Sequence, residues 1–355
     1  MDTSRIEKLT NAFGPAGFET EVARLIPNIY KGSKKLEADT MNNVFIGLKG
    51  EKKKLRIMLD AHIDEVGFMV SYVHDNGMLG LHALGGWVEH NLPSQIFLIR
   101  NDKGEYIRGV VASKPPHFMS EEERSRGLKL DHLVVDLGVS SADEVRELGI
   151  GIGSPMVPEV AFKAFPERNL LMGKAFDCRL GVAALLEVIE TIEELNLDLE
   201  VVGSLSSQEE GGLRGAQVSA RRIEPDLALV FEGCPADDSF LAPPEAQTLL
   251  HHGPMLRHVD RGMLTHPGFQ SFALGIARKQ DIACQEAVRS GGSTNGSPIH
   301  LSNAGVPTIV LGIPVRYIHS HYGYASMKDY GATVELAIEI LKAINEEVYQ
   351  SFKPF

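Results

Sequence analysis

The sequence predicts an α/β fold that carries a β-rich insertion, and three observations support this prediction. Strand-like and helix-like segments alternate before about residue 70 and again after about residue 162. Between them, short strand-like runs are separated by turn signals, a pattern typical of a small barrel or sandwich. The length of 355 residues suits two domains or one large domain with an insertion. We therefore expect one α/β domain over residues 1–69 and 163–355, and a second domain over residues 70–162.

The N-terminal part is expected to form two helices followed by strands. The segments Ser4–Phe13 and Glu19–Ile29 are the predicted helices. The run Leu55–His62 begins as a mixed apolar segment and ends in polar residues. This pattern indicates a largely buried strand whose C-terminal end lies at a functional site.

The predicted insertion contains strand-like runs such as Gln95–Ile99. Turn signals stand at Asp75–Gly77, Asn101–Gly104 and Lys114–Pro116, where Gly, Asn, Asp and Pro favour tight turns. One helix is expected at Ser141–Leu148. Short strands at this spacing favour a small β-barrel or sandwich.

The α/β pattern returns after Lys174. Apolar residues at helical spacing predict a helix over Leu180–Leu195. The remaining predicted elements are strands at Leu199–Leu205, Leu227–Phe231 and Val306–Ile313, and a long closing helix at Asp329–Gln350.

Composition and charge exclude several classes of protein. The chain has 47 acidic against 35 basic residues and a net charge of −12, whereas nucleic-acid and anionic-membrane surfaces need clustered Lys and Arg. We find no signal-peptide pattern and no apolar run long enough to span a membrane. The cysteines Cys178, Cys234 and Cys284 are scattered without CxxC spacing, which predicts free thiols and a cytoplasmic location.

Polar residues capable of holding metal ions stand at the ends of predicted strands and at one helix start. His62 and Asp64 are two residues apart in an extended segment, so they can face one pocket, and a carboxylate commonly orients a ligating His. Asp177 precedes a predicted helix, where it could be an ordinary N-cap or could bridge two cations. A solvated strand end remains the alternative for His62 and Asp64.

The remaining candidates are acids and a histidine after later strands. Glu209 and Glu210 precede a pair of glycines, so one could ligate a metal while the other accepts a proton. Glu232 follows the apolar run 227–231, and His319 follows another predicted strand. Each residue taken singly could be structural or solvated. Together they make two divalent sites with nitrogen and oxygen ligands plausible.

These segments, in this order, resemble the tetrahedral (TET) aminopeptidases of metallopeptidase family forty-two, which includes glutamyl and deblocking aminopeptidases and whose members have often been labelled endoglucanase. The resemblance covers essentially the whole chain. The matching segments are Asp60–Phe68, Gly85–Trp87, Lys114–His117, Ser207–Ala216, Gly305–Thr308 and Arg316–Ser320.

The resemblance implies a phosphorylase/hydrolase-like catalytic domain with a mixed sheet and an inserted PDZ-like β-barrel. The catalytic domain would be a di-metal peptidase, and the insertion would serve dimerisation and substrate access. Dimers would assemble into a hollow tetrahedral dodecamer that admits short peptides with a free N-terminus. Two divalent ions are implied for each subunit, zinc with cobalt or manganese as alternatives.

The resemblance also implies a role for each candidate residue. A metal-bridging water would lose its proton to the general base Glu209 and attack the first peptide carbonyl. Glu209 would then return the proton to the leaving nitrogen, and Asp64 would orient His62. His62 and Glu232 would hold one metal, Glu210 and His319 the other, and Asp177 would bridge them.

Four positions depart from the family pattern. Many relatives carry Asp where this chain has Glu232. Many also carry Asp where this chain has Asn295, and this second change could alter the substrate pocket. Cys178 places a thiol beside the expected bridging ligand, where relatives often carry Asp or Asn. His321 stands where Pro is usual, and we prefer His319 as the ligand because the surrounding Arg-Tyr-Ile-His-Ser segment is intact.

Three other functions compete with a metal-dependent aminopeptidase. One is a related di-zinc amidohydrolase, such as a carboxypeptidase or a deacylase. Another is a metal-independent glycosidase that uses Glu209 and Glu210. Such enzymes place their two carboxylates on either side of the sugar bond, an arrangement that two adjacent residues fit poorly. The third is a non-catalytic binding protein that keeps the fold. Neither the preferred N-terminal residue nor the native metal follows from the sequence.

Overall fold

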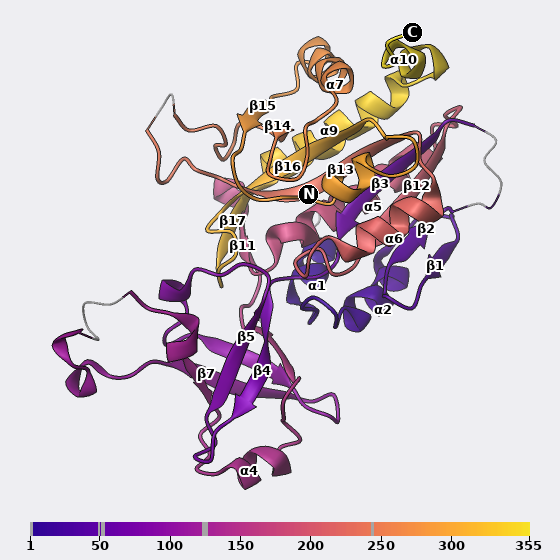
Figure 1. The fold of residues 1–355 in the computed structure, drawn as a ribbon. Coiled ribbons are helices and arrows are strands. Elements are labelled where there is room, and N and C mark those ends of the chain that lie inside the picture. The colour runs from indigo at the N-terminus through magenta and orange to yellow at the C-terminus, as the bar shows by residue number, and fades with distance from the viewer. Residues whose placement is uncertain (1–2, 49, 51–53, 123–126, 243–244) are drawn as a thin grey trace.

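A mixed sheet forms the centre of the larger part of the molecule (Figure 1). The computed structural model describes residues 3–48, 50, 54–122, 127–242 and 245–355. Within these residues the sheet has eleven strands in the order β1-β2-β12-β3-β13-β16-β17-β11-β10, with β14 paired to β16 and β15 paired to β14. The strands are β1 Leu36–Ala38, β2 Val44–Ile46, β3 Arg56–His62, β10 Lys163–Phe165, β11 Leu170–Gly173, β12 Glu200–Ser206, β13 Leu227–Pro235, β14 Met255–Val259, β15 Gln285–Val288, β16 Thr308–Arg316 and β17 Gly323–Ser326.

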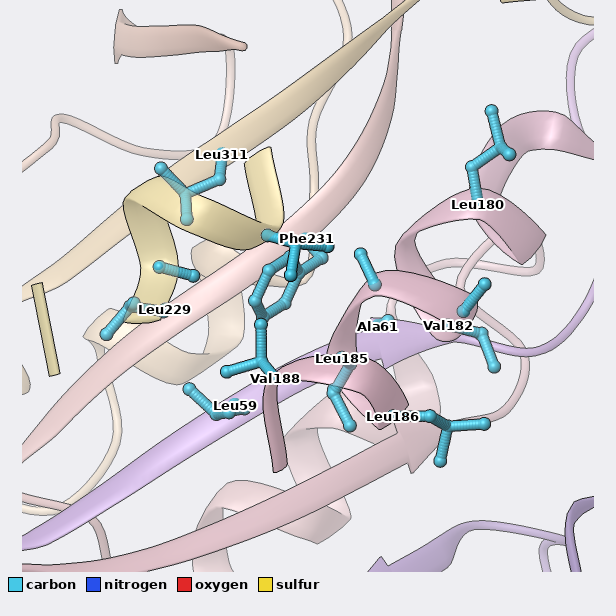
Figure 2. Close-up of a cluster of buried hydrophobic side chains, with 14 of the residues drawn as sticks. Leu59, Ala61, Leu180, Val182, Leu185, Leu186, Val188, Leu229, Phe231 and Leu311 are labelled. Carbon is cyan, nitrogen blue, oxygen red and sulfur yellow. The ribbon is translucent and has the colours of Figure 1, made fainter. Parts of the chain in front are cut away.

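The central strands β12, β3, β13 and β16 run parallel, and helices cover both of their faces. Successive side chains alternate between the faces, so Leu59 packs with helix α5 (Phe176–Glu193) and Met58 packs with helix α6 (Arg214–Ile223). Figure 2 shows the first cluster, with side chains from α5, β3, β13 and β16. Because parallel strands end at one edge of the sheet, the residues that close them are brought together there.

The predicted β-rich insertion forms a separate closed barrel. Its strands pair antiparallel in the order β4-β5-β8-β7-β6-β9 around buried residues that include Phe68, Phe97 and Val135. In Figure 1 the barrel projects from one end of the larger part. The predicted α/β fold with an inserted barrel is therefore confirmed. The barrel strands are β4 Gly67–Val73, β5 Leu79–Leu84, β6 Ile96–Arg100, β7 Tyr106–Ala112, β8 Val134–Asp136 and β9 Pro155–Pro158.

The predicted helices are mostly found close to their expected positions. α1 (Ser4–Asn11), α2 (Thr20–Ile29) and α4 (Ala142–Glu147) lie within two residues of the predicted bounds. Helices α6 (Arg214–Ile223), α7 (Pro267–Lys279) and α8 (Gly296–His300) were not predicted. In the described part of the chain, every helix is too short or too polar to cross a lipid bilayer.

The predicted closing helix over residues 329–350 is wrong, because two helices occupy that stretch. They are α9 (Met327–Ala343) and α10 (Glu346–Ser351). Ile344 and Asn345 between them are extended, and the Asn345 side chain accepts a hydrogen bond from the Val348 amide at 2.9 Å. The Asn side chain thus caps a new helix, a local preference that the apolar periodicity did not reveal.

Two further corrections concern expected metal ligands. Glu232 lies inside strand β13 rather than after it, because the strand continues to Pro235 along β16. Asp177 and Cys178 have non-helical backbone angles, so the regular turns of α5 begin after them, close to the predicted start at Leu180. Among the described residues, the Asp177 carboxylate is hydrogen-bonded to His62 and His319 and not to a backbone amide. The N-cap explanation for Asp177 is therefore wrong.

A buried ion cluster connects the loops that flank the expected site. Lys174 Nζ lies 2.6 Å from both carboxylate oxygens of Glu65, and an Arg179 nitrogen lies 3.6 Å from one of them. Arg179 also donates to the carbonyls of Leu9 and Gly14, at 2.6 and 3.3 Å. Because these charges are compensated inside the protein, they fix the segments next to Asp64 and Asp177 relative to each other.

Candidate metal centre

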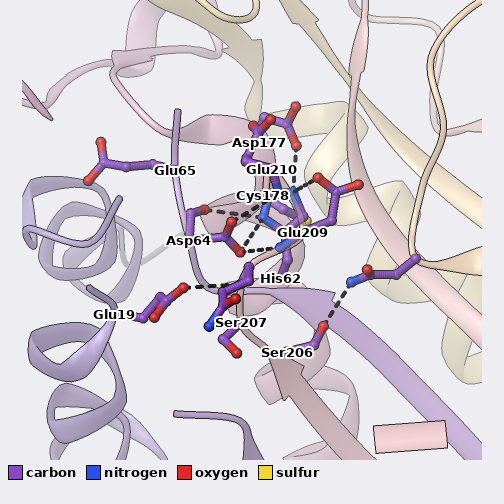
Figure 3. Close-up of polar contacts among 12 residues, drawn as sticks. Glu19, His62, Asp64, Glu65, Asp177, Cys178, Ser206, Ser207, Glu209 and Glu210 are labelled. Carbon is purple, nitrogen blue, oxygen red and sulfur yellow. Dashed lines mark hydrogen bonds and ion pairs between the residues drawn. The ribbon is translucent and has the colours of Figure 1, made fainter. Parts of the chain in front are cut away.

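Every predicted site residue comes to the edge where the parallel strands end. Figure 3 labels five of them, His62, Asp64, Asp177, Glu209 and Glu210. His62 closes β3 and Asp64 follows it. Glu209 and Glu210 lie in the turn after β12, and Glu232 lies in β13. Asp177 lies in the first turn of α5, and His319 follows β16.

Asp177 stands between two histidines. One of its carboxylate oxygens lies 3.0 Å from His62 Nε2, and the other lies 3.1 Å from His319 Nε2. His62 Nε2 is also 3.2 Å from Glu232 Oε1, and His319 Nε2 is 3.3 Å from Glu210 Oε1. Two groups, each of one histidine and one glutamate, therefore share one aspartate.

The Asp64 carboxylate holds the turn that carries the two glutamates. Its two oxygens accept hydrogen bonds from the Glu209 and Glu210 amides, both at 3.0 Å. His62 Nδ1 lies 3.1 Å from the Asp64 carbonyl oxygen and 3.5 Å from its carboxylate. Asp64 thus orients the His62 ring mainly through its backbone. A hydrogen bond of 3.1 Å from the Gln208 amide to Glu19 secures the start of the same turn.

The donor atoms fit divalent cations. Within each of the groups His62–Asp177–Cys178–Glu232, His62–Glu209–Glu210 and Asp177–Glu210–His319, nitrogen, oxygen or sulfur atoms lie within 4.8 Å of one another. Glu210 Oε1 and Glu232 Oε2 are buried without a hydrogen-bond partner among the described residues. Buried carboxylates gathered in this way need compensating positive charge. Histidine nitrogen and carboxylate oxygen are ligands that zinc, cobalt and manganese accept.

The same crowding perturbs the protonation of the cluster. Burial raises the pKa of Glu232 to about 8 and that of Glu209 well above its ordinary value. Burial lowers the pKa of His319, but the charge of Glu210 outweighs it and raises the pKa to about 11. Hydrogen bonds from His319 and His62 hold the pKa of Asp177 below its usual range despite burial. Without cations, the cluster therefore retains protons on its histidines and glutamates at neutral pH.

A pocket of about 540 Å³ opens beside the cluster. Glu209 lines it. The Glu209 carboxylate lies 4.0 Å from His62 Nε2, whereas Asp177, Glu232 and Glu210 lie 3.0 to 3.3 Å from the nearest histidine nitrogen. Arg257 and Arg289 line another part of the pocket. Neither arginine was expected at the site, because Arg257 lies in β14 and Arg289 follows β15, and neither strand was predicted.

The structure also places the residues that depart from the family pattern. Asn295 is buried and donates to Asp60 at 2.7 Å and to Ser206 at 2.8 Å. The Cys178 thiol lies beside the first group and donates to the Phe231 carbonyl at 3.1 Å. His321 is buried and belongs to neither group, which agrees with the preference for His319.

Comparison with known proteins places this arrangement among peptidases. Residues 42–336 match the family model described as M42 glutamyl aminopeptidase. The glutamyl aminopeptidase of Lactococcus lactis is 30% identical, with 99% of each chain covered. A TET aminopeptidase from Thaumarchaeota archaeon SCGC AB-539-E09 is 35% identical, with a TM-score of 0.94 over 99% of this chain and 98% of that one. The TET1 peptidase of Pyrococcus horikoshii, which can assemble into a tetrahedron or an octahedral shell, is 26% identical, with a TM-score of 0.84 over 96% and 99%.

Proposed function

The chain belongs to the M42 glutamyl aminopeptidase family and is a metal-dependent aminopeptidase, and from this premise we propose how its residues perform the reaction. His62 and Glu232 would hold one divalent cation, Glu210 and His319 would hold a second, and Asp177 would serve both. The position of Asp177, with one oxygen 3.0 Å from His62 and the other 3.1 Å from His319, supports this assignment most directly.

Glu209 is the proposed general base. When bound, a pair of cations polarises the scissile carbonyl and lowers the pKa of the attacking water. Glu209 accepts a proton from that water and passes it to the leaving amide nitrogen. Burial and neighbouring carboxylates raise the pKa of Glu209, which suits a group that must both accept and return a proton near neutral pH. Asp64 holds the Glu209 amide and so fixes the base beside the pocket.

A panel of short peptides tests the proposed function. The panel pairs peptides that carry a free N-terminus with the same peptides acetylated at the N-terminus, each assayed with a chelator and after metal add-back. We expect release of the first residue from the free peptides, loss of activity with chelator and recovery with metal. Cleavage restricted to acetylated peptides or to the C-terminal bond would instead indicate an amidohydrolase of another specificity.

The pocket favours an acidic N-terminal residue. Bound cations would balance the acids of the metal cluster, and the other charged residues among the described pocket lining are Arg257 and Arg289. Their partners, Asp260 and Asp237, lie 2.9 and 2.8 Å away and are not among the lining residues. The two guanidinium groups therefore place positive charge at the wall of the pocket, where a substrate carboxylate could pair with it.

Replacing Arg289 by Gln should reduce kcat/KM for a glutamyl substrate by about tenfold or more, the effect of losing one hydrogen bond to a charged group. An alanyl substrate should be affected much less, because its side chain does not reach a guanidinium. Arg222→Gln, which removes a half-exposed arginine outside the pocket, is the matched control. A preference for lysyl substrates in the unmodified protein would contradict this specificity while leaving the aminopeptidase activity intact.

Metal binding should strengthen as pH rises. His319 and Glu232 have raised pKa values of about 11 and about 8, so both hold protons at neutral pH in the absence of metal. Cations bind the deprotonated forms and must displace these protons, so affinity falls as pH is lowered. Calorimetric titration in buffers of different ionisation enthalpy should show proton release on binding. Affinity that is unchanged between about pH 6 and about pH 8 would contradict this expectation.

Several finer features complete the proposal. Zinc is the proposed metal, with cobalt or manganese as alternatives, since all three accept the same ligands. We propose a homo-oligomer built from dimers into a tetrahedral dodecamer, supported by the likeness to TET1 of Pyrococcus horikoshii. The role of the barrel in dimerisation and substrate access stays a prediction, as do the domain bounds. A cytoplasmic location is proposed because Cys178, Cys234 and Cys284 are unpaired.

A further inference from the structure

A turn of the barrel lies directly against the ligands proposed for the second cation. The turn is Gly85–Trp87, which follows β5. A β-carbon added at Gly85 would lie 2.8 Å from Glu210 Oε2, and one added at Gly86 would lie 3.3 Å from His319 Nδ1. Gly85 also has a φ of +86°, a conformation that favours glycine. The backbone of the barrel therefore forms one wall of this half of the centre.

The barrel also encloses His321, two residues after His319. The His321 side chain is 2% exposed, and its ring centroid lies 4.8 Å from that of Phe97 and 5.9 Å from that of Trp87, in edge-on geometry. Phe97 belongs to β6 and Trp87 to the turn defined above. Neither ring nitrogen makes a hydrogen bond of normal geometry with a described residue, although the ring lies close enough to the Ile96 backbone to interact weakly with it. The imidazole therefore contributes its flat shape to an aromatic contact.

The two histidines of the centre are oriented by different means. His62 closes a central strand, and its Nδ1 lies 3.1 Å from the Asp64 carbonyl. His319 lies in a loop with a φ of +56°, and among the described residues no hydrogen bond holds its Nδ1. A non-glycine residue in this conformation persists where its surroundings determine it. For His319 those surroundings are the glycine turn against its ring and the enclosed His321 nearby in the chain.

We propose that the barrel completes the site of the second cation, and that His321 is a positioning residue for His319. Trp87 and Phe97 hold the His321 ring, His321 fixes the loop that presents His319, and Gly85–Gly86 limit the movement of Glu210 and His319. The affinity of this site then depends on the contact between barrel and sheet. The site of His62 and Glu232, built on β3 and β13, does not share that dependence. This inference rests on the proposed ligand assignment.

Metal titration of the full-length protein tests the inference. Cobalt(II) is added to metal-free protein, and binding is followed by visible absorption and by calorimetry in the unmodified protein, His321→Ala, His321→Phe and Trp87→Ala. We expect two ions in the unmodified protein. In His321→Ala and Trp87→Ala, one ion should bind about 10–100-fold more weakly, the range found when groups supporting a metal ligand are removed, while the other ion is unaffected. His321→Phe, which keeps a planar ring, should retain both.

Tyr72→Ala provides the matched control, because it removes a half-exposed barrel aromatic outside this contact, and it should bind both ions normally. Thermal unfolding shows whether each variant is folded. His321→Ala removes the loop side of the aromatic contact, and Trp87→Ala removes its barrel side. Normal binding of both ions by His321→Ala and Trp87→Ala would overturn the inference. Loss of the second ion in His321→Phe would overturn it too, since a nitrogen would then be required. Failure of the unmodified protein to bind two ions would instead overturn the proposed centre.

Discussion

Glu209→Gln is expected to lower kcat by about 10²–10⁴-fold, the usual contribution of a general base, while the protein keeps its cations. The amide has the shape of the carboxylate but cannot accept the proton. Glu209 Oε2 is 4.0 Å from His62 Nε2, longer than the contacts of the proposed ligands, and its backbone amide stays bound to Asp64. Steady-state hydrolysis of a free-amine peptide and elemental analysis of the dialysed protein measure the two quantities separately.

Glu210→Gln is the matched control for this experiment, because it alters the adjacent residue in the same turn. Glu210 lies 3.3 Å from His319 Nε2 and belongs to the proposed second site, so this variant should lose metal as well as activity. A Glu209→Gln variant with a near-normal rate would show that another group is the base. A Glu209→Gln variant that loses metal would show that Glu209 is a ligand.

Asp177→Ala is expected to abolish activity and to remove both cations. Each carboxylate oxygen of Asp177 faces a different histidine, so the loss of this one side chain affects both proposed sites. Removing the carboxylate also leaves the glutamates of the cluster less able to retain positive ions, since opposite charge attracts most strongly where water is excluded. Metal content after dialysis, measured beside activity, should separate this variant clearly from Glu209→Gln.

Two further variants provide reference values for the metal content of Asp177→Ala. His62→Ala should lower the occupancy of one site more than the other, because His62 contacts Asp177 and Glu232 but not His319. Glu193→Gln removes a carboxylate outside the cluster, one that accepts hydrogen bonds from Ser33, and should keep both ions. Full metal content in Asp177→Ala would contradict the bridging role.

The positions of the candidate ligands could be predicted from the sequence because they are tied to strand ends. His62, Glu209 and Glu210 close or follow apolar runs that form parallel strands, and parallel strands place such residues at one edge of the sheet. Distances could not be predicted in this way. That the Asp64 carboxylate accepts from two backbone amides depends on how the turn after β12 meets the end of β3.

Other parts of the site depend on segments with weak local signals. Arg257 and Arg289 reach the pocket from the edge of the sheet, where short strands give little periodicity. The end of β13 was placed too early because Glu232 and Gly233 interrupt an apolar run, yet pairing with β16 extends the strand through them. Pairing between distant strands outweighs local residue preference in such cases.

By itself, the sequence determined the α/β class, the β-rich insertion and the residue types of the candidate centre, because apolar periodicity and strand-end polar residues are local properties. It could not decide between a helix cap and a shared ligand for Asp177, or show that His321 packs against Phe97. Those outcomes depend on contacts between residues far apart in the chain, such as Asp177 with His319 and the barrel with the loop after β16. Only the packing of the complete chain decides which distant side chains meet. That packing brings a few of the acids behind the net charge of −12 into one buried cluster, which requires cations to balance it.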